Sequence, residues 1–432
     1  MDLISSLFVF IENETGACTV SFFILEEMYQ EAGMSLLDEL SKQEVWKKFY
    51  EYKTSLVCPK DIADNLRGFI DRREYKPVCD LIDKGEFSLP ARSVISKQSS
   101  QKKRTVFTYP MPENTVLKLL TYLMLRKYDG IFSNDLFSFR PGRTAKDAIH
   151  MLLKDPKIFE KYSYKVDVSD YFNSIPIELM IPGLKEVLCD DERLFDFLKG
   201  LLEEQYVIDK KSSEKVPGGK KGIMAGTPIA SFYANLYLKD LDRMFEDRGI
   251  TYARYSDDII VFADTKEEVI GYSDEIKEYL YKKGLRVNPA KECFGDKDEG
   301  FVFLGFGLKK GVIDVAPASV TKLKQKMRRK TRALMRWRKR NALSGEKAAK
   351  AFIRVFNRKL LESSQDSDLS WAYWYFSTIN TVQSLHEIDR YAQECIRYLI
   401  SGTHTKARYN ILYDDIKKLG YRSLVNAYYG QP

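Results

Sequence analysis

Two adjacent carboxylates, flanked by β-forming segments, limit strongly how the centre of this chain can fold. Asp257 and Asp258 follow Tyr252 and Tyr255, and an unbroken apolar run, Ile259 to Ala263, comes directly after them. β-Formers on both sides of a short polar pair predict a tight hairpin, and a run that is apolar throughout is typical of a strand covered on both faces. The two Asp side chains are therefore expected at the tip of a packed hairpin. Alone, the pair also fits an ordinary turn, in which Asp is common.

A third carboxylate, Asp167, lies in a segment with strand periodicity. From Tyr162 to Val168, apolar and aromatic residues alternate with polar ones, which is the period of a half-buried strand. Asp167 is thus expected on the polar face, near the end of a strand. Three carboxylates on neighbouring strand ends can hold two oxygen-seeking cations such as Mg²⁺. Such a pair, about 4 Å apart, stabilises the attacking and leaving oxygens of a displacement at phosphorus. The alternative is that Asp167 only caps a strand.

The basic residues are concentrated in one segment. The net charge of the 432-residue chain is +8, but residues 321–360 hold sixteen Lys and Arg against Glu346 alone, so this segment is +15 and the remainder −7. A basic stripe on an otherwise slightly acidic protein is typical of a surface that binds a polyanion. Charge runs are also common on solvated faces. Helical spacing of the apolar residues among these cations favours an ordered helical domain.

Composition is that of a soluble globular protein with room for more than one domain. Hydrophobic residues make up 44% of the chain and charged residues 30%. No stretch approaches about 20 uninterrupted apolar residues, so a membrane-spanning helix and a membrane partner are not expected. The N-terminal sequence from Met1 to Ile4 lacks the basic region of a signal peptide. We therefore expect a cytoplasmic location.

Two elements in the first half of the chain present further cations. A polar loop contains Lys102, Lys103 and Arg104 and leads into an alternating, strand-like segment. Such a loop suits a lid whose cations meet a triphosphate, and it equally suits a surface hairpin. Further on, Arg140 and Arg143 bracket a Pro-Gly turn, which precedes a predicted helix whose N-terminal amides attract anions. By itself this second element fits an ordinary capped turn.

A Gly-Thr-Pro segment precedes another predicted helix. Gly226 would let the backbone approach a flat or phosphorylated ligand closely, whereas Thr227 and Pro228 equally fit an ordinary helix start. The elements from the Asp167 strand onward follow the order strand, helix, helix, hairpin, helix, strand. That order predicts an α+β fold with helices on one face of a sheet.

Taken in order, these motifs resemble those of a reverse transcriptase. The basic loop, Phe-Arg-Pro-Gly-Arg at 139–143, the Asp167 strand, the Gly226 helix, Tyr255-Ser-Asp-Asp and the elements at 288–291 and 303–306 match the polymerase motifs between about residues 95 and 310. The sequence at 139–143 is similar to the bacterial group II intron lineage in particular. The resemblance implies a right-hand polymerase fold, with fingers and a palm built on an antiparallel sheet, followed by an α-helical, thumb-like C-terminal domain.

The same resemblance implies a division of the chain and roles for single residues. The expected parts are an N-terminal extension with the start of the fingers (1–90), the fingers and palm (91–310) and a basic helical thumb and C-terminal domain (311–432). Asp167, Asp257 and Asp258 would hold two Mg²⁺ ions, with Mn²⁺ as an alternative, and Lys291 would donate a proton to the pyrophosphate. The residues expected at the incoming deoxynucleotide are Lys102, Lys103, Arg104, Phe172, Gly226 and Tyr255. The residues expected at nucleic acid are Arg140, Arg143, Lys326, Arg328, Arg329, Arg332, Arg336 and Arg338.

One of these expectations follows the family pattern closely, and one segment departs from it. Phe172, five residues after Asp167, matches the aromatic that blocks a ribose 2′-hydroxyl, which favours deoxynucleotides. Group II intron enzymes carry Gln-Gly and then Ser-Pro in the helix motif, where this chain has Ala225-Gly226 and Ala230-Ser231. The departure suggests an unusual template or priming mode.

The biological role is a hypothesis based on the C-terminal end. No Cys/His-rich endonuclease module is evident, and Leu419 to Tyr429 resembles the end of stand-alone bacterial reverse transcriptases that act in antiphage defence or abortive infection. The leading hypothesis is an RNA-directed DNA polymerase that makes DNA from deoxynucleoside triphosphates and a non-coding RNA encoded nearby. Open alternatives are a retron- or group II intron-derived polymerase with another role, a protein-primed polymerase without a template, and an inactive RNA-binding scaffold. Carboxylates that face one another without cations would repel, which argues against the scaffold. Self-association is left open.

Overall fold

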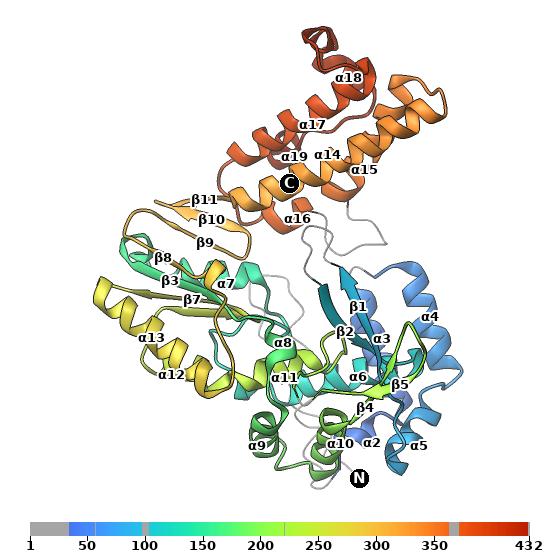
Figure 1. Cartoon of the computed structure of the whole chain (residues 1–432), viewed down its shortest axis with the longest axis vertical. Coiled ribbons are helices and arrows are strands. Elements are labelled where there is room, and N and C mark those ends of the chain that lie inside the picture. The colour runs from blue at the N-terminus through green and yellow to red at the C-terminus, as the bar shows by residue number, and fades with distance from the viewer. Residues whose placement is uncertain (1–33, 57, 97–102, 220, 363–370, 431–432) are drawn as a thin grey trace, which may run out of the picture.

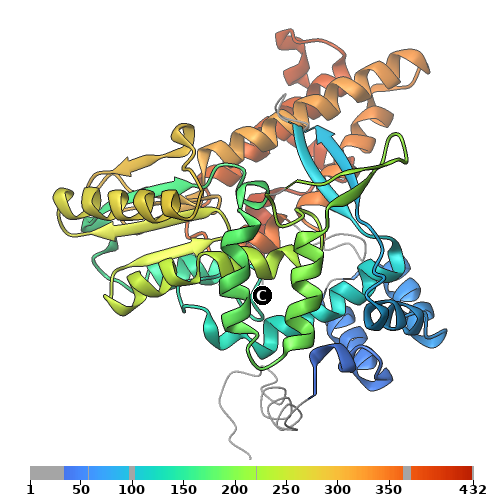
Figure 2. The ribbon, with the colours of Figure 1, turned by 60° about the horizontal axis from the view of Figure 1, so that its bottom comes forward.

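The structure is a computed structural model that describes residues 34–56, 58–96, 103–219, 221–362 and 371–430. In the described part of the chain, the strands form three sheets, and long helices surround them (Figure 1). The N-terminal helices lie on one side, the sheet that carries Asp167 lies on the other, and the C-terminal helices stand above both. Figure 2 shows the same division after rotation. Lys102 lies outside the described residues.

The N-terminal side combines a helical base with a four-stranded sheet. Strand β1 (Ala91–Ser96) pairs antiparallel with β2 (Lys103–Thr108) and parallel with β4 (Tyr206–Asp209), and β4 pairs with β5 (Lys215–Pro217). In the base, the Trp46 ring is fully buried and stacks on Tyr75. The helices of this side are α2 (Leu36–Glu39), α3 (Gln43–Ser55), α4 (Lys60–Asp71), α5 (Lys76–Lys84) and α6 (Met111–Lys127).

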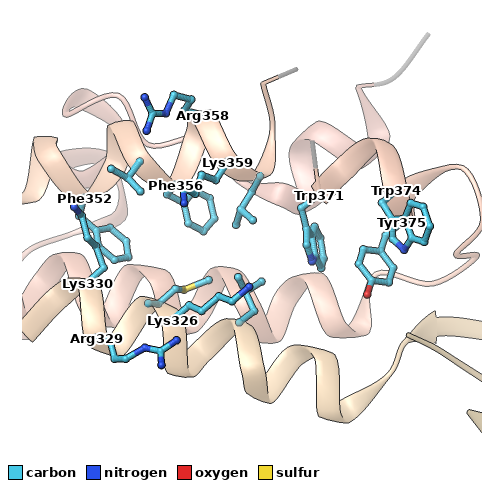
Figure 3. A pocket seen from close by; sticks show the side chains of 14 residues that line it. Lys326, Arg329, Lys330, Phe352, Phe356, Arg358, Lys359, Trp371, Trp374 and Tyr375 are labelled. Carbon is cyan, nitrogen blue, oxygen red and sulfur yellow. The ribbon is translucent and has the colours of Figure 1, made fainter. Parts of the chain in front are cut away.

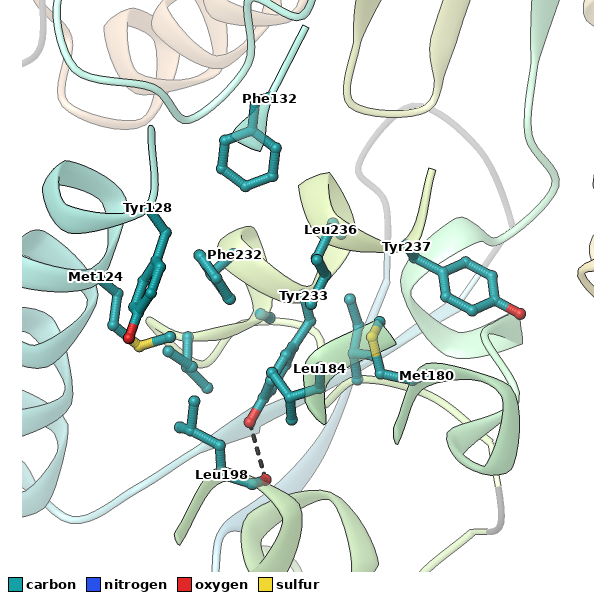
Figure 4. Packing of buried hydrophobic residues seen from close by; sticks show 14 of the residues in the cluster. Met124, Tyr128, Phe132, Met180, Leu184, Leu198, Phe232, Tyr233, Leu236 and Tyr237 are labelled. Carbon is teal, nitrogen blue, oxygen red and sulfur yellow. Dashed lines mark hydrogen bonds between the residues drawn. The ribbon is translucent and has the colours of Figure 1, made fainter. Parts of the chain in front are cut away.

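One helix at the centre of the first core is apolar on nearly every side. Helix α11 (Ala230–Tyr237) is buried from end to end except at Ser231, as expected of a helix with neighbours all around it. Figure 4 shows the rings of Phe232 and Tyr233 pointing among residues of α6, α9 and α10, and the Tyr233 hydroxyl donates to the Leu198 carbonyl at 3.0 Å. The remaining helices of this region are α8 (Tyr171–Ser174), α9 (Ile177–Val187), α10 (Glu192–Glu203) and α12 (Lys239–Asp247).

The sheet that carries the carboxylates is antiparallel throughout, in the order β6-β7-β3-β8. Its strands are β3 (Tyr162–Asp167), β6 (Tyr252–Tyr255), β7 (Asp258–Ala263) and β8 (Cys293–Gly295). Strand β7 is buried from Ile259 onward, so the predicted doubly covered strand is confirmed.

Successive residues of β7 enter two different cores, because side chains alternate across a strand. Ile259 and Val261 pack with α13 (Lys266–Lys282), whereas Ile260 and Phe262 pack with α7 (Ala145–Leu152). The expectation of helices on one face only was therefore wrong, because α7 covers part of the second face. Strand β3 is also more buried than predicted: Ser163 and Asp167, on its polar face, are only 5% and 4% exposed.

The C-terminal part is helical and rests on a small sheet. Strands β9 (Phe301–Phe303), β10 (Phe306–Lys309) and β11 (Val312–Val315) form an antiparallel meander that leads into α14. The buried Asp389 carboxylate accepts hydrogen bonds from the Tyr421 hydroxyl and the Leu424 amide, at 2.7 and 3.0 Å. This contact closes the end of the chain onto the domain. The helices are α14 (Pro317–Arg340), α15 (Gly345–Leu360), α16 (Trp371–Phe376), α17 (Gln383–Ser401), α18 (Tyr413–Lys418) and α19 (Leu424–Tyr429). Among the described residues, no helix is both long and apolar enough to cross a membrane.

Candidate active site

The three carboxylates meet where β3 ends and β7 begins. Tyr255 pairs with Asp258 across the β6–β7 hairpin, and Asp167 pairs with Asp258 across β3 and β7. The Val168 amide donates to the carbonyl of Asp257 at 3.0 Å, which joins the turn to the end of β3. Paired residues of antiparallel strands project to the same face, so Asp167 and Asp258 share a face. The predicted hairpin, with the Asp pair at its tip, is confirmed.

The turn between the strands is held by a buried polar network. Ser256 has a left-handed backbone (φ 60°), a conformation that residues other than glycine adopt at a cost. Its amide donates to the Ser138 hydroxyl at 2.8 Å, and Ser138 donates to the Asn235 side chain at 3.1 Å. The Asn235 amide returns a bond to the Ser138 carbonyl at 2.8 Å. Elements far apart in the sequence therefore fix the position of the two Asp residues.

An ion pair with no solvent exposure completes this network. The Arg254 guanidinium lies 2.5 Å from the Asp242 carboxylate of α12, and both side chains are 0% exposed. Arg254 also donates to the carbonyl of Ser256 at 3.2 Å, and Tyr252 donates to Asp242 at 2.9 Å. Sequence reasoning missed this pair. The available signal was an Arg within an otherwise apolar strand, because a buried cation requires a partner.

Burial and mutual repulsion raise the proton affinity of the Asp pair. Removal from water, and then the charge of Asp167, raise the pKa of Asp257 to about 6. Burial also raises the pKa of Asp258, although Lys165, 3.9 Å away, opposes the shift. Lys322 at the start of α14 opposes it as well. A site that disfavours its own negative charge gains when cations bind, so the donor chemistry fits divalent ions.

Lys291 is placed against the first carboxylate by a short loop. The Asn288 amide donates to the Asp167 carbonyl at 2.8 Å, and the Lys291 ammonium forms an ion pair with the Asp167 carboxylate. Within the described ranges, no three His, Cys, Asp or Glu side chains already form a metal-binding cluster. In this structure the charge of Asp167 is balanced by Lys291. The expected transfer of a proton from Lys291 to pyrophosphate stays a prediction.

The segment around Gly226, which precedes α11, contacts strand β2, which follows the basic loop. The Phe107 amide of β2 donates to the Ala225 carbonyl at 2.8 Å. Gly226 has φ +102°, and a Cβ there would lie 3.0 Å from the Phe107 carbonyl oxygen. No other residue type fits this contact without strain. Arg104 lies exposed on the same strand, and Lys103 forms its first residue.

Phe172 and Tyr255 pack against different hydrophobic cores. Helix α8 carries Phe172, whose carbonyl accepts from the Ile223 amide at 2.8 Å and whose ring meets the Phe139 ring edge-on at 6.3 Å. Phe139 is 42% exposed and has φ 57°, an arrangement that sequence reasoning missed. Tyr255 is half-buried against the second core. The contacts of both residues with nucleotide stay predictions.

The expected nucleic-acid contact of Arg140 is corrected by its surroundings. Its side chain is 3% exposed, pairs with Asp129 at 2.7 Å and donates to the Ser133 carbonyl at 2.5 Å. Every donor group of Arg140 faces an acceptor of the protein, so this Arg supports the loop. Arg143 is half-exposed and donates to the Asn134 carbonyl at 2.5 Å.

The basic residues of α14 divide according to the helical repeat. Residues three and four apart share a face, and the buried residues Met327, Leu334 and Met335 define the inner one. Arg338 falls on that inner face, is half-exposed and donates to the Leu399 carbonyl at 2.9 Å; its contact with nucleic acid stays a prediction. The exposed cations of this helix that were predicted to bind nucleic acid are Lys326, Arg328, Arg329, Arg332 and Arg336.

The raised pKa of Asp135, which lies beside this polar network, predicts that the stability of the protein depends on pH. Burial, and then the charges of Glu246 and Asp242, raise the pKa of Asp135 to about 7, against the opposing charge of Arg143. The folded state thus binds the proton more tightly than the unfolded chain, and this contribution to stability is lost progressively as the pH rises from about 4, where an unfolded Asp ionises, to about 7. Asp135→Asn is expected to stabilise the protein at pH 8.5 by about 1–2 kcal/mol, discounted for partial solvent exposure, and hardly at pH 4. Denaturant unfolding at both pH values checks this; an equal effect at both would contradict it.

Comparison with known proteins identifies the central region. Residues 95–308 match the family described as reverse transcriptase (RNA-dependent DNA polymerase). An uncharacterized 91 kDa protein in the cob intron of Schizosaccharomyces pombe is 24% identical over 178 residues, which cover 39% of this chain and 21% of that protein. The chain therefore matches about a fifth of that relative's length.

Solved telomerases are similar to parts of this chain at low identity and with TM-scores below 0.5. An apo telomerase from Candida tropicalis, truncated from its C-terminal domain, has a TM-score of 0.41 and 12% identity, over 52% of this chain and 55% of that one. A telomerase from Candida albicans, in complex with a TWJ fragment of telomeric RNA, has a TM-score of 0.42 and 10% identity, over 78% and 66%.

Proposed function

We propose that residues 95–308, which match the reverse transcriptase family, form a right-hand polymerase domain of the RNA-directed DNA polymerase class, a class of nucleotidyltransferases. We propose that the whole chain copies an RNA template into DNA by two-metal phosphoryl transfer. The observation that carries the proposal is the meeting of Asp167, Asp257 and Asp258 at adjoining strand ends.

When bound, two Mg²⁺ ions would supply the Lewis acid that polarises the reacting phosphoryl group and stabilises the leaving pyrophosphate. Asp167, Asp257 and Asp258 would hold these ions. Lys291, now paired with Asp167, would move to the pyrophosphate as a proton donor. The edge-on contact of the Phe172 ring with Phe139 supports its role in excluding a ribose 2′-hydroxyl, and the exposed Arg104 would contact the triphosphate.

We propose further that the template is a dedicated non-coding RNA and that the DNA product acts in cytoplasmic antiphage defence. The resemblance of the C-terminal end to stand-alone bacterial enzymes supports this role. The similarity to an intron-encoded protein favours a mobility role as the second candidate. Expression from the native locus in a phage-sensitive host separates them: reduced plaque formation that depends on Asp257 and Asp258 supports defence, and unchanged plaque numbers favour the second candidate.

Nucleic acid that co-purifies with the protein from its native locus tests the templating proposal. One dominant RNA together with complementary DNA would establish templated synthesis and identify the template. DNA of simple sequence linked to protein would replace templating with protein-primed synthesis. RNA without DNA, even after Mg²⁺ and deoxynucleotides are added, would favour an inactive scaffold.

The exposed face of α14 is expected to bind the nucleic-acid backbone. Replacing Arg332 and Arg336 by Gln removes two exposed cations and should weaken RNA binding several-fold. The slope of log affinity against log salt should fall by about 1.4 to 1.8, because each lost phosphate contact removes about 0.7 to 0.9. The matched control replaces Lys417 and Lys418, exposed cations of α18, and should leave the slope unchanged. Fluorescence anisotropy at several salt concentrations measures the affinity and the slope. An equal slope in wild type, the α14 variant and the α18 control would show that RNA does not bind at Arg332 and Arg336.

A further inference from the structure

A groove of about 1080 Å³ opens in the C-terminal domain between α14, α15 and α16 (Figure 3). Its floor is apolar and includes the buried side chains of Met327, Phe352 and Phe356. Trp371 and Trp374, both half-exposed, stand at one end. Half-exposed tryptophan faces of this kind are good surfaces for stacking a flat ring. The groove therefore has the shape and lining of a site for planar, apolar groups.

The rim of the groove is positively charged on both sides. Lys326 and Lys330 lie on α14, and Arg358 and Lys359 lie on α15; all four are exposed. Among the residues that the structure describes, no Asp or Glu lines the groove. An apolar floor with a cationic rim complements a ligand that combines flat rings with negative charge.

The groove adjoins the turn between β9 and β10 through α16. The Tyr375 ring, at one end of the groove, contacts Trp371 at 4.6 Å between ring centroids and Phe306 at 5.1 Å. A Cβ added to Gly305, in this turn, would lie 2.9 Å from the Tyr375 hydroxyl. The resemblance implies that the turn, at residues 303–306, grips the primer. Tyr375 therefore joins the expected primer contact to the groove.

We propose that the groove binds unpaired bases of a single-stranded nucleic acid, which stack on Trp371 and Trp374 while their phosphates contact Lys326, Lys330 and Lys359. The inference rests on the proposed function, because the polymerase site supplies the strand. A duplex offers phosphates but keeps its base faces stacked inside, so it cannot use the apolar floor. An acidic peptide matches the cations but lacks the series of flat rings. Stacking of this kind tolerates every base.

Binding of matched oligonucleotides tests the inference without synthesis. The full chain, kept in EDTA, is titrated with a fluorescein-labelled single-stranded 12-mer of thymidine and with an abasic 12-mer of the same charge. The base-containing strand should bind about 5- to 100-fold more tightly, since each stacked base contributes substantially. Trp371→Leu with Trp374→Leu should bring it close to the abasic strand. Tyr281→Leu, at an aromatic that is 74% exposed on α13, is the matched control and should keep the difference.

A second measurement uses the unaltered protein, so that misfolding of the variant cannot decide the result. The chain has four Trp, of which Trp46 is fully buried in the base. The thymidine strand should quench the intrinsic fluorescence, whereas the abasic strand and a duplex should not. Equal quenching by all three, equal affinity of the two 12-mers, or equally effective competition by polyglutamate would overturn the inference. If wild-type protein synthesises DNA but fails these tests, the inference about the groove is wrong and the proposed function stands. If the protein shows base-dependent binding but no synthesis, the proposed function is wrong instead.

Discussion

Replacing Asp257 or Asp258 by Asn is expected to reduce DNA synthesis by about 1000-fold or more, because metal stabilisation of the reacting phosphoryl group contributes several kcal/mol to the barrier. Binding of RNA should change little, since the exposed cations of α14 lie on another element. The measurement is primer extension in the presence of Mg²⁺, combined with RNA binding by anisotropy. If both variants synthesise DNA at a rate within tenfold of wild type, Asp257 and Asp258 do not hold the catalytic metal ions.

The same variants should fold, and their stability provides the control. Burial raises the pKa of Asp257 to about 6, so at pH 7 the folded, metal-free protein holds this carboxylate ionised at a cost. Asn removes that charge, and the variant should unfold at the same or a higher temperature than wild type. This benefit should shrink as the pH falls from about 6 and vanish near pH 4, where Asp257 is protonated in both the folded and the unfolded protein. A strongly lowered melting temperature would instead attribute the lost synthesis to unfolding.

Replacing Asp242 by Ala is expected to destabilise the protein by about 3–5 kcal/mol, because Arg254 is left buried without its partner. Both side chains are 0% exposed and 2.5 Å apart. Asp240→Ala, at an exposed residue of the same helix that pairs with Lys239, is the matched control and should cost less than about 1 kcal/mol. Denaturant unfolding measures both.

A compensating variant separates loss of the charge partner from loss of packing. Asp242→Leu combined with Arg254→Met replaces the pair by apolar groups of comparable size, and it should recover much of the stability. Synthesis should remain low, because Arg254 also donates to the carbonyl of Ser256 beside the catalytic turn. Equal stabilities of Asp242→Ala and Asp240→Ala would show that the buried pair does not hold the turn.

The sequence predicted most reliably those parts of the site that depend on local pattern. The Asp257-Asp258 turn and the Asp167 strand end follow from alternation and apolar runs, and the structure brings them together in register. Long helices such as α13 and α14 follow from the helical spacing of their apolar residues. The right-hand fold itself came from the order of motifs, because periodicity alone places no element against another.

Contacts between distant segments could not be predicted from the sequence. Arg140 and Arg143 look alike beside a Pro-Gly turn, yet only Arg140 meets Asp129 and buried carbonyls. Likewise, Arg338 differs from Arg336 only by its place on the helix, which turns it toward the Leu399 carbonyl. Charge composition shows how many cations a segment has, whereas tertiary packing decides which of them remain available to a ligand.

Primer extension on a defined template shows whether the chain is an RNA-directed DNA polymerase. Purified protein would receive Mg²⁺, an RNA template with an annealed DNA primer, and either deoxynucleotides or ribonucleotides. We expect DNA that is complementary to the RNA and is made with deoxynucleotides only. EDTA and Asp258→Asn should each abolish its synthesis. Product of unrelated sequence, or extension that Asp258→Asn leaves intact, would contradict this expectation.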